Sequence, residues 1–91
     1  MEKKGNSLHQ TIMTRMAILG ENMFENNEPF FRDGKTLWIN CARNWHTNIV
    51  ESVEQASEGE TLIVMNHTQR ELALKAIRRM RPNDNIRCQI G

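Results

Sequence analysis

The sequence predicts a small α/β fold with a mainly parallel sheet of three or four strands and helices packed on it. Two observations predict it. Between residues 35 and 90, short apolar segments typical of strands alternate with longer stretches that repeat apolar residues at helical spacing. Turn-forming residues separate these segments from one another. The length of 91 residues fits one domain, 1–91, in which we expect residues 1–6 to be flexible.

A first helix is predicted near the N-terminus. Ser7 is a suitable N-cap, and Gly20 is a position at which the helix could end early. Its apolar stripe consists of Leu8, Ile12, Met16, Leu19 and Met23. The turn residues at 26–29 mark its latest end. We expect this helix to cover the face of the sheet that the later helices leave open.

A β-hairpin is predicted to follow. Asp33-Gly34 stands between two apolar runs, and glycine supplies the positive φ that a tight hairpin turn requires. We therefore expect a short edge strand at 29–32, antiparallel to a strand at 35–41. The alternative is a loop that carries the two phenylalanines of this segment over the core.

The second helix and the central strand come next. The helix stripe is Trp45, Ile49, Val53 and Ala56. Glutamates at 51, 54 and 58 fall on or near the opposite face of this helix, and Gly59 terminates it. The uninterrupted apolar run at 61–65 is typical of a central strand that is covered on both faces.

The third helix and the last strand complete the predicted order α-β-β-α-β-α-β. Thr68, with Glu71 three residues later, predicts a capping box at the start of the helix. The helix is expected to bury Leu72, Ala73, Ala76, Ile77 and Met80. Apolar and polar residues then alternate from Ile86 to Ile90, which indicates an edge strand. The sequence does not define the strand order, so a wholly parallel core and a mixed sheet both fit.

Composition and charge exclude several classes of protein. The hydrophobic fraction of 38% and the charged fraction of 25% are typical of globular rather than disordered chains. A formal net charge of +1 gives no overall attraction to nucleic acid or to anionic membranes. No apolar stretch is long enough to span a bilayer, and the N-terminus lacks the apolar segment of a secretory signal. We therefore expect a cytoplasmic protein that does not bind membranes.

The chain has two cysteines, Cys41 and Cys88, which are too few for a disulfide scaffold. Both fall in predicted strands. We expect them to be reduced and buried as small apolar side chains. A disulfide between them is the alternative if their strands are neighbours.

The third helix and the residue after it carry five of the 12 lysines and arginines of the chain. Its cations, together with one in the last strand, are Arg70, Lys75, Arg78, Arg79, Arg81 and Arg87. One interpretation is a solvated face whose charges near the helix C-terminus stabilise the helix through its dipole. The other is a docking face for phosphate groups or for an acidic protein surface, because arginine forms paired hydrogen bonds with either anion. Because the second helix is acidic, pairing of the two helices between copies would give a homodimer.

A second group of polar residues is predicted at the carboxyl edge of the sheet. These are Arg43 and Asn44 after the first long strand, and Asn66, His67 and Thr68 after the central strand. Ligand sites concentrate at this edge of parallel sheets, and free amides at helix starts bind anions. The alternative is that Asn66 and His67 only form the turn and the cap. Cys41 stands at the same edge, where it could form a thiol–imidazole pair with His67.

No motif for a nucleotide, another cofactor or a metal stands out. Residues 33–36, Asp-Gly-Lys-Thr, end like a phosphate-binding loop, but position 29 is Pro where the first glycine is required, and a strand follows. The histidines at 9, 46 and 67 lack the spacing of zinc ligands, and neither cysteine has a C-x-x-C neighbour. We expect neither a cofactor nor a resident metal.

The sequence favours a non-catalytic binding or regulatory protein. It would dock on a larger protein partner, as an inhibitor, adaptor or subunit, through the basic third helix. The first alternative is a nucleic-acid-binding protein that contacts the phosphate backbone through the same helix. The absence of aromatic residues from this helix argues against single-strand binding, whereas binding to a duplex backbone needs none. The second alternative is a small thiol enzyme that uses Cys41 and His67.

Overall fold

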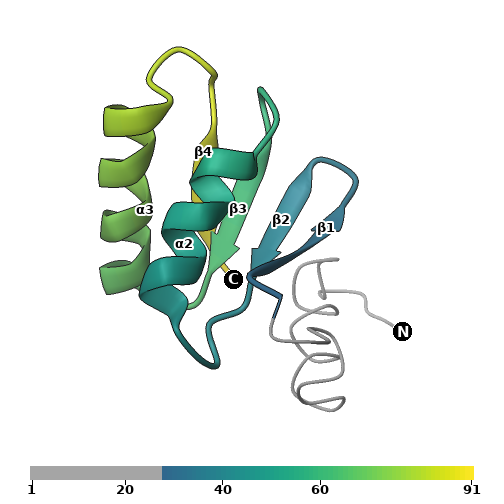
Figure 1. Cartoon of the computed structure of the whole chain (residues 1–91), viewed down its shortest axis with the longest axis vertical. Coiled ribbons are helices and arrows are strands. Elements are labelled where there is room, and N and C mark those ends of the chain that lie inside the picture. The colour runs from purple at the N-terminus through teal and green to yellow at the C-terminus, as the bar shows by residue number, and fades with distance from the viewer. Residues whose placement is uncertain (1–27) are drawn as a thin grey trace, which may run out of the picture.

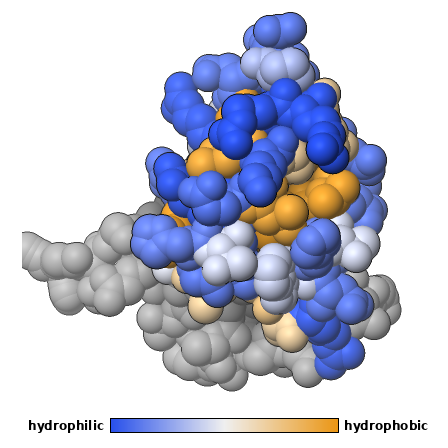
Figure 2. All heavy atoms as spheres, turned by 90° about the vertical axis from the view of Figure 1, so that its left-hand side faces the viewer, coloured by the Kyte–Doolittle hydropathy of each residue, from blue (hydrophilic) through white to orange (hydrophobic). Residues whose placement is uncertain are grey.

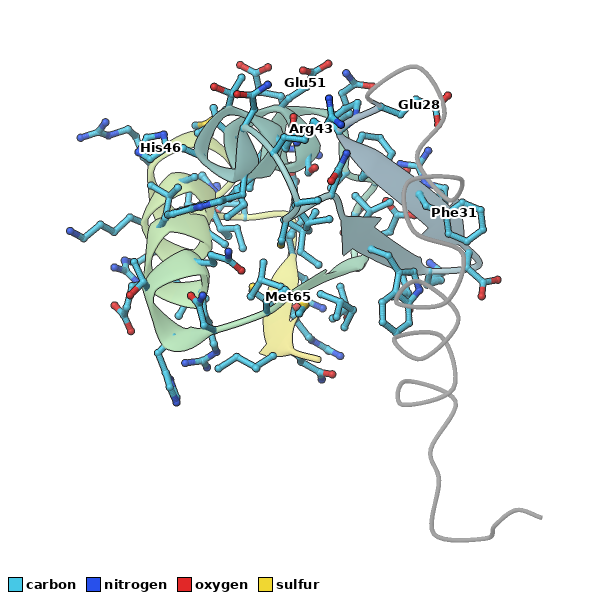
Figure 3. The ribbon with its side chains drawn as sticks, turned by 90° about the horizontal axis from the view of Figure 1, so that it is seen from below. Glu28, Phe31, Arg43, His46, Glu51 and Met65 are labelled. Atoms are coloured by element: carbon cyan, nitrogen blue, oxygen red, sulfur yellow. The ribbon has the colours of Figure 1, made fainter. Side chains whose placement is uncertain are left out.

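Four strands and two helices make up the part of the chain that the structure describes. The structure is a computed structural model that describes residues 28–91. In chain order the elements are β1 (Phe30–Asp33), β2 (Thr36–Ile39), α2 (Trp45–Gln55), β3 (Thr61–Val64), α3 (His67–Met80) and β4 (Arg87–Ile90). The strands form one sheet in the order β1-β2-β3-β4. Both helices lie side by side on the same face of this sheet (Figure 1 and Figure 3).

β1 and β2 form the predicted hairpin. They pair antiparallel with Asp33 opposite Thr36, so a two-residue loop that begins at Gly34 joins them. Gly34 has a φ of 63°, and a positive φ at this loop position is strongly disfavoured for residues other than glycine. Phe30 packs against the core from β1. The edge strand is therefore confirmed, and the alternative of a loop over the core is wrong.

The rest of the sheet is parallel. β2 pairs with β3 and β3 pairs with β4, and a helix joins the strands of each pair. Such crossovers are right-handed, and both advance in the same direction across the sheet, so the two helices fall on one face. β3 is central and β4 is an edge strand, as the sequence predicts. The strand order, which the sequence leaves open, is sequential.

The predicted order α-β-β-α-β-α-β is not matched in full. The described residues contain two helices rather than three. The sheet is mixed, because the short hairpin makes β1 antiparallel to its neighbour. The predicted first helix, with its stripe from Leu8 to Met23, lies outside the described residues, and so does the segment 1–6.

One hydrophobic core lies between the sheet and the two helices. It consists of Leu37, Ile39, Ile49, Val53, Ala56, Leu62, Val64, Ala73, Ala76, Ile77, Ile86 and Cys88. The helical stripes thus bury most of the residues predicted for them, but Trp45, Leu72 and Met80 are only half-buried. Leu72 and Met80 lie at the seam between α3 and α2 rather than beneath α3. Their partial exposure leaves apolar surface between the two helices.

The start of α3 differs from the predicted capping box. Its N-cap is Asn66, whose side-chain Oδ1 accepts a hydrogen bond from the Gln69 backbone N–H at 2.9 Å. Gln69 Oε1 in turn accepts a hydrogen bond from the Met65 N–H at 2.8 Å. The prediction that Thr68 and Glu71 cap the helix is therefore wrong. The Asn66 side chain satisfies an otherwise free amide two residues earlier, so the helix already includes Thr68.

Candidate docking surface

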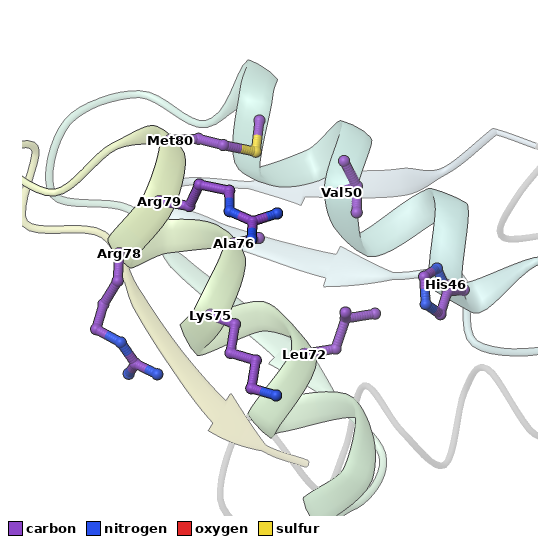
Figure 4. A pocket seen from close by; sticks show the side chains of 8 residues that line it. All are labelled: His46, Val50, Leu72, Lys75, Ala76, Arg78, Arg79 and Met80. Carbon is purple, nitrogen blue, oxygen red and sulfur yellow. The ribbon is translucent and has the colours of Figure 1, made fainter.

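A groove with a volume of about 720 Å³ runs between α2 and α3 at the surface. It is lined by His46 and Val50 from α2, and by Leu72, Lys75, Ala76, Arg78, Arg79 and Met80 from α3. Figure 2 shows this side of the molecule, where an apolar patch is surrounded by hydrophilic side chains. Figure 4 shows Leu72, Arg79 and Met80 directed from α3 toward α2, with Val50 and His46 on the opposite side. We call its apolar side chains the groove floor and its cations from α3 the groove rim.

The groove floor consists of Val50, Leu72, Ala76 and Met80. The three floor residues of α3 follow one another at intervals of four, so they lie along one side of that helix. Ala76 is buried, whereas Leu72 and Met80 are half-buried. The small side chain at the centre therefore leaves space between two larger ones, and an apolar side chain of a partner could occupy it.

The groove rim consists of Lys75, Arg78 and Arg79. All three side chains are exposed, and residues three and four positions apart share one side of a helix. Among residues 28–91, no acidic side chain forms an ion pair with any of them. Arg78 and Arg79 also lie in the last turn of α3, where positive charge is favourable with the helix dipole. The rim is therefore a cationic surface without a counter-ion from the described chain.

Arg81 follows α3 directly and has a structural role. Its Nη1 donates hydrogen bonds to the carbonyl oxygens of Val53 and Glu54 at 2.9 and 3.1 Å, and its Nε forms an ion pair with Asp84 at 2.6 Å. These two carbonyls belong to the last turn of α2, where helical carbonyls have no partner within the helix. Arg81 therefore joins the end of α3 to the end of α2.

Arg70 and Arg87, the other two predicted cations, lie away from the groove. Arg70 is half-buried and donates from Nε to the Cys88 carbonyl of β4 at 3.3 Å. Arg87 is exposed in β4, next to Cys88, which faces the core. Because successive side chains of a strand alternate between faces, Arg87 lies on the sheet face opposite the helices. Of the six cations, only the three rim residues meet at the groove.

The residues predicted for the carboxyl edge of the sheet are exposed. They are Arg43, Asn44, Asn66, His67 and Thr68. Asn44 precedes α2 with a left-handed backbone at a φ of 51°, and Asn66 is the N-cap of α3. The structure thus shows a capping role for Asn66, and an anion site at this edge stays a prediction.

Two buried asparagines that the sequence patterns do not single out hold the connection from β2 to α2. Asn48 Nδ2 donates to the carbonyls of Asn40 and Arg43 at 3.0 and 2.8 Å. Asn40 Nδ2 donates to the Glu28 carbonyl at 3.1 Å, and its Oδ1 accepts from the Ala42 N–H at 3.1 Å. These amides satisfy backbone groups that would otherwise be left without partners. This part of the edge is therefore a structural network.

Cys41 and Cys88 are free thiols. Burial raises the pKa of each to about 11, although a hydrogen bond with the Met65 backbone lowers that of Cys41 and the charge of Arg70 lowers that of Cys88. Both thiols are therefore protonated at neutral pH, and a protonated thiol is a poor nucleophile. Within the described part of the chain, no hydrogen bond joins Cys41 to the exposed His67.

Glu60 is a buried carboxylate with only 4% of its surface exposed. Arg32 donates to both of its oxygens at 2.9 and 3.0 Å, and the Ser57 N–H donates at 2.7 Å. Burial acts to raise the pKa of Glu60, but these hydrogen bonds and the charges of Arg32 and Lys35 outweigh it, so the pKa is lowered. The only sequence signal for this pair is a charge just before a buried strand, which does not identify a partner 28 residues away. The pair joins β1 to the turn before β3.

The described part of the chain offers neither a metal site nor a membrane-spanning helix. Residues 28–91 assemble no group of three or more His, Cys, Asp or Glu side chains that could hold a metal ion. Neither of their two helices has the length and apolar character needed to cross a membrane. No family model, curated protein or solved structure matches the chain.

Proposed function

We propose that this chain is a small, non-catalytic binding protein that docks on a larger protein partner in the cytoplasm, as an inhibitor, adaptor or subunit. The groove between α2 and α3 would be the docking surface. The observation that carries the proposal is an apolar floor beside three exposed cations that have no counter-ion among the described residues. Of the six cations predicted to bind a partner, we retain for this role the three that line the groove, Lys75, Arg78 and Arg79.

The apolar floor favours a protein over a nucleic acid as the partner. Protein interfaces combine an apolar centre with a polar rim, and a few buried anchors provide most of their affinity. A phosphate backbone is bound through cations, and exposed bases stack on aromatic rings. α3 contains no aromatic residue, and side chains such as Leu72 and Met80 have no counterpart on a phosphate backbone.

The state of Cys41 supports a non-catalytic role. A thiol nucleophile requires an adjacent base or a lowered pKa. Burial instead raises the pKa of Cys41 to about 11. The thiol-enzyme alternative therefore lacks the activation that its chemistry requires.

An affinity pull-down from the native host tests the proposal. The bait is the full chain, either wild type or carrying Arg78→Glu and Arg79→Glu (R78E/R79E), and each extract is divided into portions with and without nuclease. We expect the wild type to retain a protein after nuclease treatment and R78E/R79E to lose it. Far-ultraviolet circular dichroism should show both baits folded, because losing the favourable interaction of two exposed charges with the helix dipole costs only about 0.3–1 kcal/mol each.

Three outcomes would reject the proposal. Undiminished capture by R78E/R79E would remove the rim cations from the function. Capture that disappears with nuclease, together with an affinity that falls steeply with salt, would favour the nucleic-acid alternative. Self-association of the purified wild type that R78E/R79E abolishes, with no other protein captured, would indicate the homodimer instead.

A further inference from the structure

We infer that the segment that occupies this groove is an amphipathic α-helix of the partner, with an apolar stripe and acidic residues beside it. The inference rests on the proposed function and specifies the chemistry of the docked segment. Three features of the groove support it: its position between two helices, the spacing of its floor, and the placement of all its rim cations on one helix.

The groove lies between two helices that run side by side (Figure 1). Side chains on helices form ridges, and a further helix packs by inserting its own ridge between those of its neighbours. Amphipathic helices bind apolar grooves through anchors at positions i, i+3, i+4 and i+7. A helical segment therefore matches the shape of the groove.

The groove floor fixes the spacing of the anchors. Leu72 and Met80 are eight residues apart, which corresponds to about 12 Å along a helix. Ala76 lies between them and leaves room for one large apolar side chain of the partner. Met80 can adjust to the shape of that side chain, because methionine is unbranched and flexible. About two turns of a partner helix would therefore cover the floor.

The groove rim selects an acidic segment. Lys75, Arg78 and Arg79 all come from α3, and no residue that lines the groove is acidic. A partner helix with Asp or Glu on the side of its stripe that faces α3 would pair with these cations. Exposed ion pairs add little affinity, so the apolar anchors would provide most of the binding energy. The charges would orient the segment and speed its association.

A small anionic ligand matches the groove less well. Sites for small molecules place a few polar groups among apolar ones to fix the orientation of the ligand. The groove floor offers only Val50, Leu72, Ala76 and Met80, and the cations stand exposed at the rim. A small anion would therefore contact the rim and leave the floor open to water.

Synthetic peptides test the inference on the full-length, isotope-labelled chain. The probe is a peptide of about 16 residues, long enough to form a marginal helix, with leucines at i, i+4 and i+7 and glutamates beside them. One control peptide has the same composition but no stripe, and the other carries lysine in place of glutamate. We expect the probe to shift the amide resonances of Val50 and of residues 72–80. Its affinity should exceed that of either control by about tenfold or more.

Two matched pairs of variants locate the bound probe. L72A and L74A make the same change at half-buried leucines of α3, but only Leu72 lines the groove. R79E and R87E make the same change in charge, but only Arg79 belongs to the rim. We expect L72A and R79E to lower the affinity for the probe by about fivefold or more. L74A and R87E should lower it by less than about twofold. The amide spectrum of each free variant shows whether it is folded.

Equal binding of the probe and the stripe-less control would overturn the inference, and so would resonance shifts confined to residues outside the groove. The proposed function fails by a separate measurement. A pull-down that depends on Arg78 and Arg79, combined with a probe that does not bind, would leave docking intact and reject the acidic helix as its occupant.

Discussion

The cations of α3 and its C-cap fall into two groups that differ in what their charges do. Arg70 and Arg81 each donate a hydrogen bond to a backbone carbonyl of a neighbouring element. Lys75, Arg78 and Arg79 stand between them in the chain and are exposed, without an acidic partner among the described residues. The first group joins α3 to β4 and α2, whereas the second lies exposed beside the groove.

The two groups of cations differ in whether a free backbone carbonyl oxygen lies within hydrogen-bond distance. The last turn of a helix and the outer side of an edge strand both present carbonyl oxygens without partners. Arg81 reaches the last turn of α2, and Arg70 reaches β4, which is an edge strand. The rim residues instead stand beside the apolar side chains of the groove. The number of cations on α3 and its C-cap is therefore larger than the number that line the groove.

Arg81→Ala should have the largest effect. We expect it to lower the free energy of unfolding by about 2–3 kcal/mol, because it removes charged hydrogen bonds at the end of α2. The matched control Arg79→Ala should lower stability by less than about 1 kcal/mol, because it removes only a favourable charge near the end of the helix dipole. Urea unfolding followed by circular dichroism measures both. Similar losses in the two variants would contradict the division of the cations into two groups.

Glu60→Gln should lower the free energy of unfolding by less. It tests whether Arg32, like Arg70 and Arg81, has a structural role. We expect a loss of about 1–2 kcal/mol at neutral pH, because Arg32 loses its charged partner. The folded-state pKa of Glu60 is lowered, so its contribution is fully present above the ordinary carboxyl pKa of 4.5 and is lost as pH falls through the lowered value. The wild type and the variant should therefore converge in stability in acid. Urea unfolding at graded pH measures this, and a difference that stays constant into acid would count against the ion pair.

Arg70→Ala should have a smaller effect still. Its single hydrogen bond to the Cys88 carbonyl is 3.3 Å long, so we expect a loss of about 0.5–1 kcal/mol. Lys75→Ala is the control on the same helix. If the two variants unfold at the same urea concentration, the hydrogen bond of Arg70 to β4 does not stabilise the fold, and Arg70 has no structural role.

The smallest expected effect is the reaction of the two cysteines with an alkylating reagent. Burial raises the pKa of both Cys41 and Cys88 to about 11, so almost no thiolate is present at neutral pH. We expect iodoacetamide to modify the folded chain more slowly than a free thiol, with a rate that rises in alkali. Rapid modification of Cys41 at neutral pH would contradict the raised pKa and would favour a thiol site at the carboxyl edge of the sheet.

Local signals predicted much of the described fold. The hairpin turn at Gly34, the apolar stripes of both helices and the alternation in β4 each act within a few residues, so they can be read from the chain. The cap of α3 could not be settled in this way. Asn66 with Gln69 and Thr68 with Glu71 offer two overlapping start signals two residues apart, and nothing local decides between them.

The candidate site was harder to predict, because tertiary contacts decide it. The basic character of α3 is visible in the sequence, but the acceptors of Arg81 lie 27 and 28 residues away. Helical spacing also does not distinguish a side chain beneath a helix from one at the seam with its neighbour. Leu72 and Met80 were therefore predicted as core residues, whereas the structure places them in the groove floor.

The affinities of R79E and R87E for the captured protein, measured side by side at one salt concentration, test the central claim most directly. The two variants carry the same change in charge, but only Arg79 lies at the groove. We predict that R79E weakens binding by about fivefold or more, which is about 1 kcal/mol, and that R87E weakens it by less than about twofold. Equal losses would contradict the account, because the partner would then respond to the overall charge of the chain rather than to the groove rim.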